Sequence, residues 1–173
     1  TSRLLAVVRE DGWLELWDAA SAEKAASWKI EPPLNGYGNP EPAFKALAFS
    51  PDGHWLAVSS ERGWKDTEIL LFEPAASPLS PRFIIRSTEQ AHALAFSPDS
   101  HLLYAIGNFS NNITAWDVET QTIAASWPPG AGSLLSLMVR GDTLAVVSES
   151  GLVTAWNNPP SGLRQEIQLS YTW

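Results

Sequence analysis

Short apolar segments alternate with polar turn residues along the whole chain. A segment of five or six mostly apolar residues occurs four times. Each copy is followed by a second segment, in which apolar and polar residues alternate before an aromatic residue. The first set is LLAVV (4–8), WLAVSS (55–60), LLYAIG (102–107) and TLAVVS (143–148). The second set is WLELWD (13–18), EILLFE (68–73), ITAWDV (113–118) and LVTAWN (152–157). Runs this short, rich in β-branched and aromatic residues and bounded by turn residues, predict β-strands.

Turn motifs stand directly before three of the apolar segments. SPDG (50–53) and SPDS (97–100) precede the second and third, and RGD (140–142) precedes the fourth. In SPDG, proline presets φ, the Asp side chain bonds back to its own backbone, and glycine accepts a positive φ. We therefore predict a chain reversal between antiparallel strands at each motif, and we interpret RGD as a turn rather than an adhesion signal.

A longer near-copy establishes the repeat. WDAASAEKAASW (17–28) returns 99 residues later as WDVETQTIAASW (116–127). The aromatic residues that end the alternating segments, Trp17, Phe72, Trp116 and Trp156, are 40 to 55 residues apart. Each repeat thus has room for about four short strands, and a four-stranded unit of about 40–45 residues is typical of a β-propeller blade.

The phrases FSPDGHWLAV and LWD resemble the WD-repeat family in its bacterial style, and the resemblance covers essentially the whole chain. The stretch LLYAIGNFSNNITAWDVETQTI also resembles the YVTN-type propeller repeat. The resemblance implies an all-β fold, a propeller or partial propeller of about four four-stranded antiparallel blades. The first blade lacks its strand a. We place the blades of this single propeller segment (1–173) at residues 1–31, 43–87, 90–128 and 132–170.

Four blades are fewer than a WD-repeat ring usually has. A ring of about seven blades needs about 300 residues, and this chain has 173. The chain could be a piece of a longer protein, be completed by another copy or another chain, or close as a four-bladed ring. An open arc exposes two blade faces, each on the order of 500–1,000 Å², more than monomers usually leave bare. We therefore expect an oligomer or a protein partner, either a second copy or the rest of a split or parent propeller.

Composition removes several classes of function. The net charge is −8 without any Lys/Arg cluster, which argues against nucleic-acid binding. The absence of cysteine excludes disulfides, thiolate zinc sites and cysteine nucleophiles. No apolar run approaches the roughly 20 residues that a membrane helix needs, so we expect no membrane insertion. We favour a cytoplasmic location and leave an extracytoplasmic one open.

Candidate chemistry is sparse. No motif of a serine hydrolase, zinc protease or P-loop enzyme is present, and we predict no catalytic residue, metal ligand or cofactor. His54 and His101 occupy matching positions after two turns, which favours a structural role. His92 is the one candidate for a central channel site of a YVTN-like or lactonase-like propeller enzyme. That enzyme is one alternative function, and a regulatory repeat segment of a larger signalling protein is another.

The favoured function is a non-catalytic scaffold or assembly module that binds proteins. Two long polar segments carry aromatic residues, PPLNGYGNPEP (32–42) and SSERGWKDTE (59–68). The family resemblance implies that these segments are loops on one face of the propeller. Aromatic residues and arginine dominate binding hot spots. We predict a binding patch made by Tyr37, Arg62, Trp64 and Lys65, with Phe109 at its edge. The alternative is that these aromatic residues fold back onto their own blade.

The patch leads to a first prediction. Trp64→Ala should weaken binding of a protein partner while leaving the thermal unfolding temperature nearly unchanged, because a hot-spot side chain serves the interface rather than the core. Thermal unfolding and a binding titration on the same samples check this. A large drop in unfolding temperature would assign Trp64 to packing instead.

Overall fold

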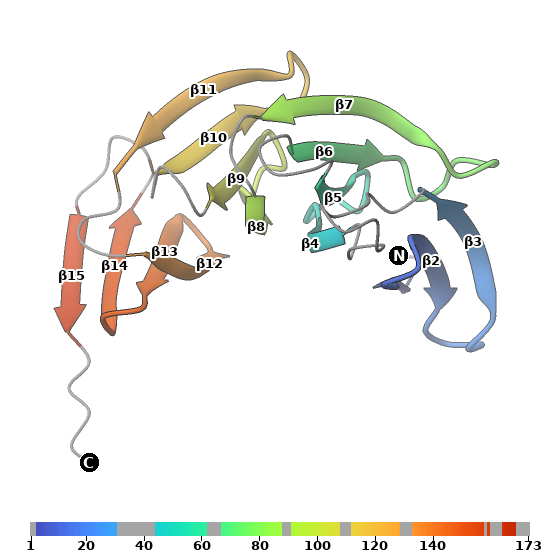
Figure 1. Cartoon of the computed structure of the whole chain (residues 1–173), viewed down its shortest axis with the longest axis horizontal. Coiled ribbons are helices and arrows are strands. Elements are labelled where there is room, and N and C mark those ends of the chain that lie inside the picture. Colours follow the sequence, from blue (N-terminus) through green and yellow to red (C-terminus); the bar gives the residue numbers. More distant parts are fainter. Residues whose placement is uncertain are drawn as a thin grey trace, which may run out of the picture. The chain divides into compact units, whose positions relative to one another are not determined.

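The computed structural model describes residues 3–30, 44–61, 67–87, 91–107, 112–128, 133–157, 159 and 164–168. In these ranges the regular elements are strands, and they form four antiparallel sheets (Figure 1). The chain divides into two compact units, Thr1–Thr88 and Glu89–Trp173, each with two sheets. We call them the N-terminal and the C-terminal unit.

Strands that follow one another in the sequence pair as neighbours in every sheet. The first sheet consists of β1 (Leu4–Val8), β2 (Trp13–Asp18) and β3 (Lys24–Lys29). The second consists of β4 (Phe44–Phe49), β5 (Leu56–Glu61), β6 (Thr67–Phe72) and β7 (Pro81–Ser87). The third consists of β8 (Ala91–Phe96), β9 (Leu102–Gly107), β10 (Ile113–Asp117) and β11 (Thr122–Trp127). The fourth consists of β12 (Leu134–Arg140), β13 (Thr143–Ser148), β14 (Leu152–Asn157) and β15 (Arg164–Gln168). The predicted all-β class is confirmed, with one three-stranded sheet followed by three four-stranded sheets.

The Ser-Pro-Asp turns reverse the chain through their side chains. In the β4–β5 turn, Asp52 Oδ1 accepts hydrogen bonds from the Ser50 hydroxyl at 2.5 Å and from the His54 amide at 2.9 Å. In the β8–β9 turn, Asp99 Oδ1 accepts the same two bonds, from Ser97 and His101. Each serine hydroxyl also accepts a backbone amide five residues ahead. The repeated phrase therefore encodes the strand reversal that the sequence predicts.

The aspartates that follow the strand-ending tryptophans close the next turn. Asp18 Oδ1 accepts the amides of Ala20 and Ser21 at 2.8 and 2.9 Å. Asp117 Oδ1 accepts the amide and the hydroxyl of Thr120 at 2.7 and 2.9 Å. These hydrogen bonds favour the ionised carboxyl and lower the pKa of Asp18 and of Asp117.

Replacing Asp117 by asparagine should lower the unfolding temperature by a few degrees at neutral pH and flatten its dependence on pH. The folded pKa lies below the ordinary value of 3.8, so the folded state binds the proton less readily than the unfolded chain. The stabilisation is therefore present above 3.8 and is lost as the pH falls through the lowered folded pKa. Thermal unfolding from neutral pH to about pH 3 measures this. Glu119→Gln, two residues away and exposed, is the control and should keep the wild-type slope.

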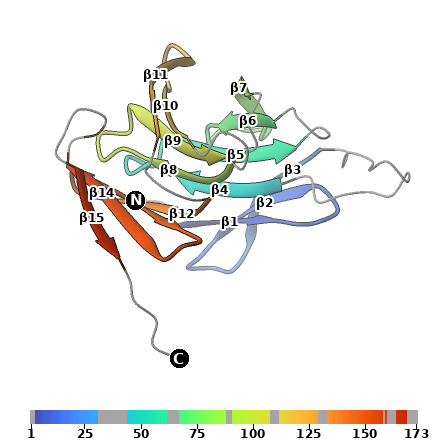
Figure 2. The same ribbon diagram turned by 60° about the vertical axis from the view of Figure 1, so that its left-hand side comes forward.

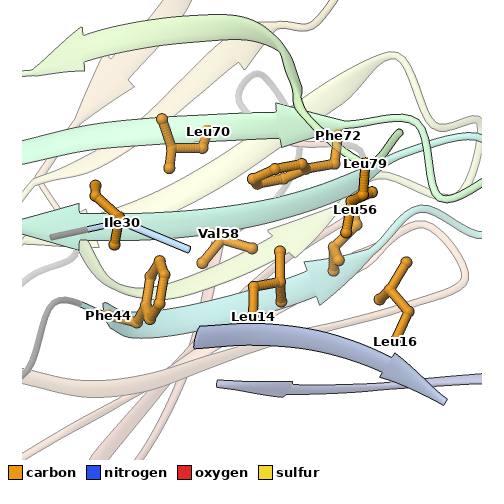
Figure 3. Packing of buried hydrophobic residues seen from close by; sticks show 9 residues of the cluster. All are labelled: Leu14, Leu16, Ile30, Phe44, Leu56, Val58, Leu70, Phe72 and Leu79. Atoms are coloured by element: carbon orange, nitrogen blue, oxygen red, sulfur yellow. The ribbon is translucent and has the colours of Figure 1, made fainter. Parts of the chain in front are cut away.

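The core of the N-terminal unit lies between its two sheets. Figure 2 shows the strands of the first sheet next to β4 of the second. Side chains from both sheets meet there, and the rings of Trp28 and Phe72 form an edge-to-face pair at 5.2 Å between centroids. Figure 3 shows nine buried members of this cluster, which are Leu14, Leu16, Ile30, Phe44, Leu56, Val58, Leu70, Phe72 and Leu79. Alternate residues of β2 and of β6 thus face one another, as the strand period of two requires.

The C-terminal unit has an equivalent core between the third and fourth sheets. Trp127 stands edge-on to Trp156 at 6.2 Å and to Tyr104 at 6.4 Å between ring centroids. His92 Nε2 lies 2.9 Å from the carbonyl oxygen of Leu134, which links β8 to β12. Aromatic packing and this hydrogen bond hold the two sheets together.

Candidate functional site

One face of the fourth sheet packs inside its unit, and the other does not. Along β13, Leu144 and Val146 are 0% and 1% exposed because they face the third sheet. Ala145 and Val147, which alternate with them, are only partly buried. Since successive side chains of a strand point to opposite faces, a second face of this sheet remains open within the unit.

This open face is apolar and has no charged residue among its described central side chains. Cross-strand register places Met138 beside Ala145, Ala145 beside Ala155, and Val147 beside Val153. Met138 is 59% exposed, and Leu135 on the same strand is 54% exposed. We call Met138, Ala145, Val147, Val153 and Ala155 the open face of the fourth sheet. Contiguous apolar surface of this kind marks interaction sites in proteins.

The first sheet also has an open face, and its composition is different. Strand register puts Leu5 beside Trp17, Val7 beside Glu15, and Trp13 beside Lys29. Leu5 is 56% exposed. We call Leu5, Val7, Trp13, Glu15, Trp17, Lys24 and Lys29 the open face of the first sheet.

A carboxylate lies at the centre of the open face of the first sheet. Glu15 is only 7% exposed, and it accepts hydrogen bonds from Lys24 Nζ at 2.9 Å and from Trp17 Nε1 at 3.1 Å. Arg9 approaches the same carboxylate at 3.8 Å. The hydrogen bond from Lys24 is the main reason why the pKa of Glu15 is lowered. Glu15 is therefore ionised and paired, which makes its burial tolerable.

Lysine side chains cover both tryptophans of the first sheet's open face. Lys24 Nζ lies 5.6 Å from the centroid of the Trp17 ring, and Lys29 Nζ lies 5.8 Å from that of Trp13. Both distances are within cation–π range. These lysines partly shield aromatic surface that no other sheet of the N-terminal unit covers.

Comparison of equivalent residues shows what this face lacks. Phe72 is the aromatic residue of the second alternating segment, and Trp156 is that of the fourth. Their side chains are 0% and 3% exposed. Phe72 packs on Trp28 of the first sheet, and Trp156 packs on Trp127 of the third. In both cases the covering residue belongs to the preceding sheet. Trp17 holds the same place in its repeat but is only partly buried, and no sheet precedes its own among the described residues of its unit.

The predicted binding patch lies outside the described residues. This applies to all of its members, Tyr37, Arg62, Trp64, Lys65 and Phe109. The patch therefore stays a prediction. Two exposed blade faces were predicted from the blade number, but the residues that form them were not named. The available signal was the shared position of Trp17 and Phe72.

The histidines have structural surroundings. The contact of His92 with Leu134 occupies its Nε2 in joining two strands. His54 and His101 donate their backbone amides within the turns, and the His54 ring stands edge-on to Trp55 at 4.9 Å. Among the residues that the structure describes, no group of three His, Cys, Asp or Glu side chains could hold a metal ion. The described part of the chain also has no helix long and apolar enough to cross a membrane.

The fold matches solved structures of WD40-repeat proteins. A structure of U3-55K covers 94% of this chain with a TM-score of 0.72 at 17% sequence identity. The crystal structure of RRP9 WD40 repeats covers 94% with a TM-score of 0.73 at 16% identity. A chain of the mitotic checkpoint complex covers 95% with a TM-score of 0.71 at 16% identity. The chain spans 47% of the length of each of these three. No protein-family model and no curated protein matches the sequence.

These matches confirm the predicted fold. The chain is a partial propeller with the fold of WD40 repeats, and its four sheets have the strand order of propeller blades. Identity below a fifth carries the fold and not the activity.

Proposed function

We propose that this WD40-type segment is a non-catalytic protein-binding scaffold or assembly module whose open faces are covered by further blades. The partner that we favour is a second copy of the chain. The observation that carries the proposal is the apolar open face of the fourth sheet, where Met138 is 59% exposed.

The repeat supports the choice of partner. Aligning β1 and β2 of the first sheet with β13 and β14 of the fourth places Ala6, Val8, Leu14 and Leu16 at the positions of Ala145, Val147, Val153 and Ala155. The first four are the residues with which the first sheet packs on the second. The open face of the fourth sheet is therefore equivalent to a face that already functions as a packing surface in this molecule.

The receiving face is also present in the chain. Leu56, Val58, Leu70 and Phe72 of the second sheet receive the first sheet. Aligning the first sheet with the second in the same way places Leu5, Val7, Glu15 and Trp17 at these positions. We infer that the fourth sheet of one copy packs on the first sheet of the next. Glu15 aligns with Leu70 of the second sheet. The contact between two copies would therefore include the ion pair that Glu15 forms with Lys24.

The absolute mass in solution tests the proposal. Light scattering on the eluate of a sizing column should give twice 18.9 kDa at micromolar concentration. A stable 18.9 kDa monomer over the whole accessible concentration range would reject assembly through a second copy. The one candidate residue of the enzymatic alternative, His92, has its Nε2 engaged with the carbonyl oxygen of Leu134.

A further inference from the structure

One edge of the first sheet has no neighbouring strand among the described residues. This sheet has three strands in the order β1-β2-β3, whereas each of the other three sheets has four (Figure 2). Aligning the repeats places β1 at the position of β5, β9 and β13. Each of those strands pairs with a neighbour on both sides, but in the described part of the chain β1 pairs with β2 alone. The first sheet has no counterpart there of β4, β8 and β12.

The direction of the hydrogen-bonding groups of β1 follows from one end of its ladder. The amide of Arg9 donates a hydrogen bond to the carbonyl oxygen of Trp13 on β2. Bonded and non-bonded residues alternate along an antiparallel pair, so Leu5 and Val7 also bond to β2. The other residues of β1 direct their amides and carbonyls to the opposite edge, and they are Leu4, Ala6 and Val8.

The burial of β1 reflects this open edge. Ala6 and Val8 pack against the buried cluster of the N-terminal unit, yet both are only partly buried. Their counterparts in β5, Ala57 and Ser59, are 0% exposed. Since a sheet already covers the face on which Ala6 and Val8 lie, their remaining exposure is at the edge of the strand.

The strand β1 has none of the features that keep an edge strand from pairing. Proteins protect such edges with charged residues, proline or β-bulges. All five residues of β1 are apolar, and its pairing with β2 has no register shift. The described outer strands differ, since β3 begins and ends with lysine and β7 contains Pro81 and two arginines. The edge of β1 is therefore suited to the addition of another strand.

We propose that the edge of β1 binds an extended segment of another polypeptide as an added antiparallel strand. Both β4 and β8 show the sequence that fits, because each contains Ala-Leu-Ala-Phe directly before Ser-Pro-Asp. In the second sheet this stretch pairs with residues 56–59, which align with residues 5–8 of β1. Main-chain hydrogen bonds give such a segment its affinity, and alternate side chains give it specificity.

The two sides of the first sheet explain the alternation of small and large residues in this segment. Paired residues of neighbouring strands have their side chains on the same face. The two alanines would lie beside Ala6 and Val8, where the second sheet leaves little room. The leucine and the phenylalanine would lie beside Val7 and Leu5, which is 56% exposed on the open face.

Hydrogen exchange on the full chain labelled with ¹⁵N, measured by nuclear magnetic resonance, tests the proposal. The probe is a capped peptide of sequence FKALAFS, which copies residues 44–50. In the chain alone, the amides of Leu5 and Val7 should be protected, and those of Ala6 and Val8 should exchange rapidly. At a peptide concentration of about ten times its dissociation constant, we expect exchange at Ala6 and Val8 to slow about tenfold.

Two methylated forms of the peptide distinguish strand addition from non-specific apolar contact. In the second sheet the amide of Ser50 donates to the carbonyl of Trp55, so by alternation the amides of Ala46 and Ala48 point to β5. N-methylation of both alanine amides of the probe should therefore abolish the protection of β1. N-methylation of the leucine and of the second phenylalanine blocks only the outer edge of the peptide and should leave the protection unchanged.

The variant Ala6→Pro tests the acceptor strand itself. It removes an amide that points to the open edge and leaves the bonds to β2 in place, and proline is tolerated at such positions of edge strands. We expect the peptide to bind this variant at least about tenfold more weakly, because one hydrogen bond is lost and the ring obstructs the edge. Unchanged protection of Leu5 and Val7 shows that the pair of β1 and β2 is intact.

Four outcomes would overturn the proposal. They are a lack of protection by the peptide, equal protection by the two methylated forms, wild-type binding by an intact Ala6→Pro variant, and amides of Ala6 and Val8 that are already protected in the chain alone. The site is an edge of the first sheet and not its open face. A monomeric chain whose β1 binds the peptide would therefore reject the second copy and support the added strand, so the two proposals fail separately.

Discussion

Phe72→Ala should lower the free energy of unfolding by about 3–5 kcal/mol, one of the two largest effects that we expect. Phe72 is 0% exposed and lies between the first and second sheets, where its ring and that of Trp28 pack edge to face with their centroids 5.2 Å apart. Truncation removes this aromatic contact and leaves a cavity between two sheets that pack only through side chains. Urea unfolding followed by tryptophan fluorescence measures the loss.

Ile84→Ala is the matched control for this substitution. Ile84 lies on β7 of the same sheet but is 42% exposed, so we expect a loss of less than about 1 kcal/mol. Equal losses for the two variants would mean that the buried cluster shown in Figure 3 does not hold the two sheets together. A loss at Phe72 that leaves the fluorescence transition of the C-terminal unit in place would show that the two units unfold separately.

Most of the strands could be predicted because their signals are local. Alternation in WLELWD and a Ser-Pro-Asp turn need only neighbouring residues to specify a strand and a reversal. The turn role of Asp52 and Asp99 follows from the same short-range chemistry. One detail departs from that simple pattern, since Ser100 takes a positive φ of 64° where the second repeat has Gly53 at 74°. The described chain tolerates a serine there, although glycine is the favoured residue.

The candidate sites depend on contacts that single repeats do not encode. Glu15 is a polar residue in an alternating strand, and alternation predicts an exposed side chain. It is 7% exposed because Lys24, nine residues away, and Trp17 both donate hydrogen bonds to it. Tyr104 and Asp142 line one cavity because the third and fourth sheets pack together, and no sequence motif connects these two residues.

Met138→Asp should abolish assembly of the chain, weakening the association of two copies by more than about a hundredfold. Met138 is 59% exposed on the open face of the fourth sheet, so its replacement leaves the fold of the unit intact. A carboxylate at this position would be buried without a partner when another sheet packs on Ala145, Val147 and Val153. Burying an unpaired charge costs several kcal/mol, which a contact of one sheet face cannot offset. Light scattering across a concentration series measures the change in mass.

Ile123→Asp supplies the comparison that decides the interpretation. Ile123 is 56% exposed on β11 of the same unit, so this variant gains the same charge and loses a similar apolar side chain. It does not lie on the open face of the fourth sheet, and we expect its mass to equal that of the wild type. If both variants became monomeric, added charge rather than the open face would control assembly. If neither did, the contact between copies would use another surface, and the first sheet's open face would need the equivalent test through Leu5→Asp.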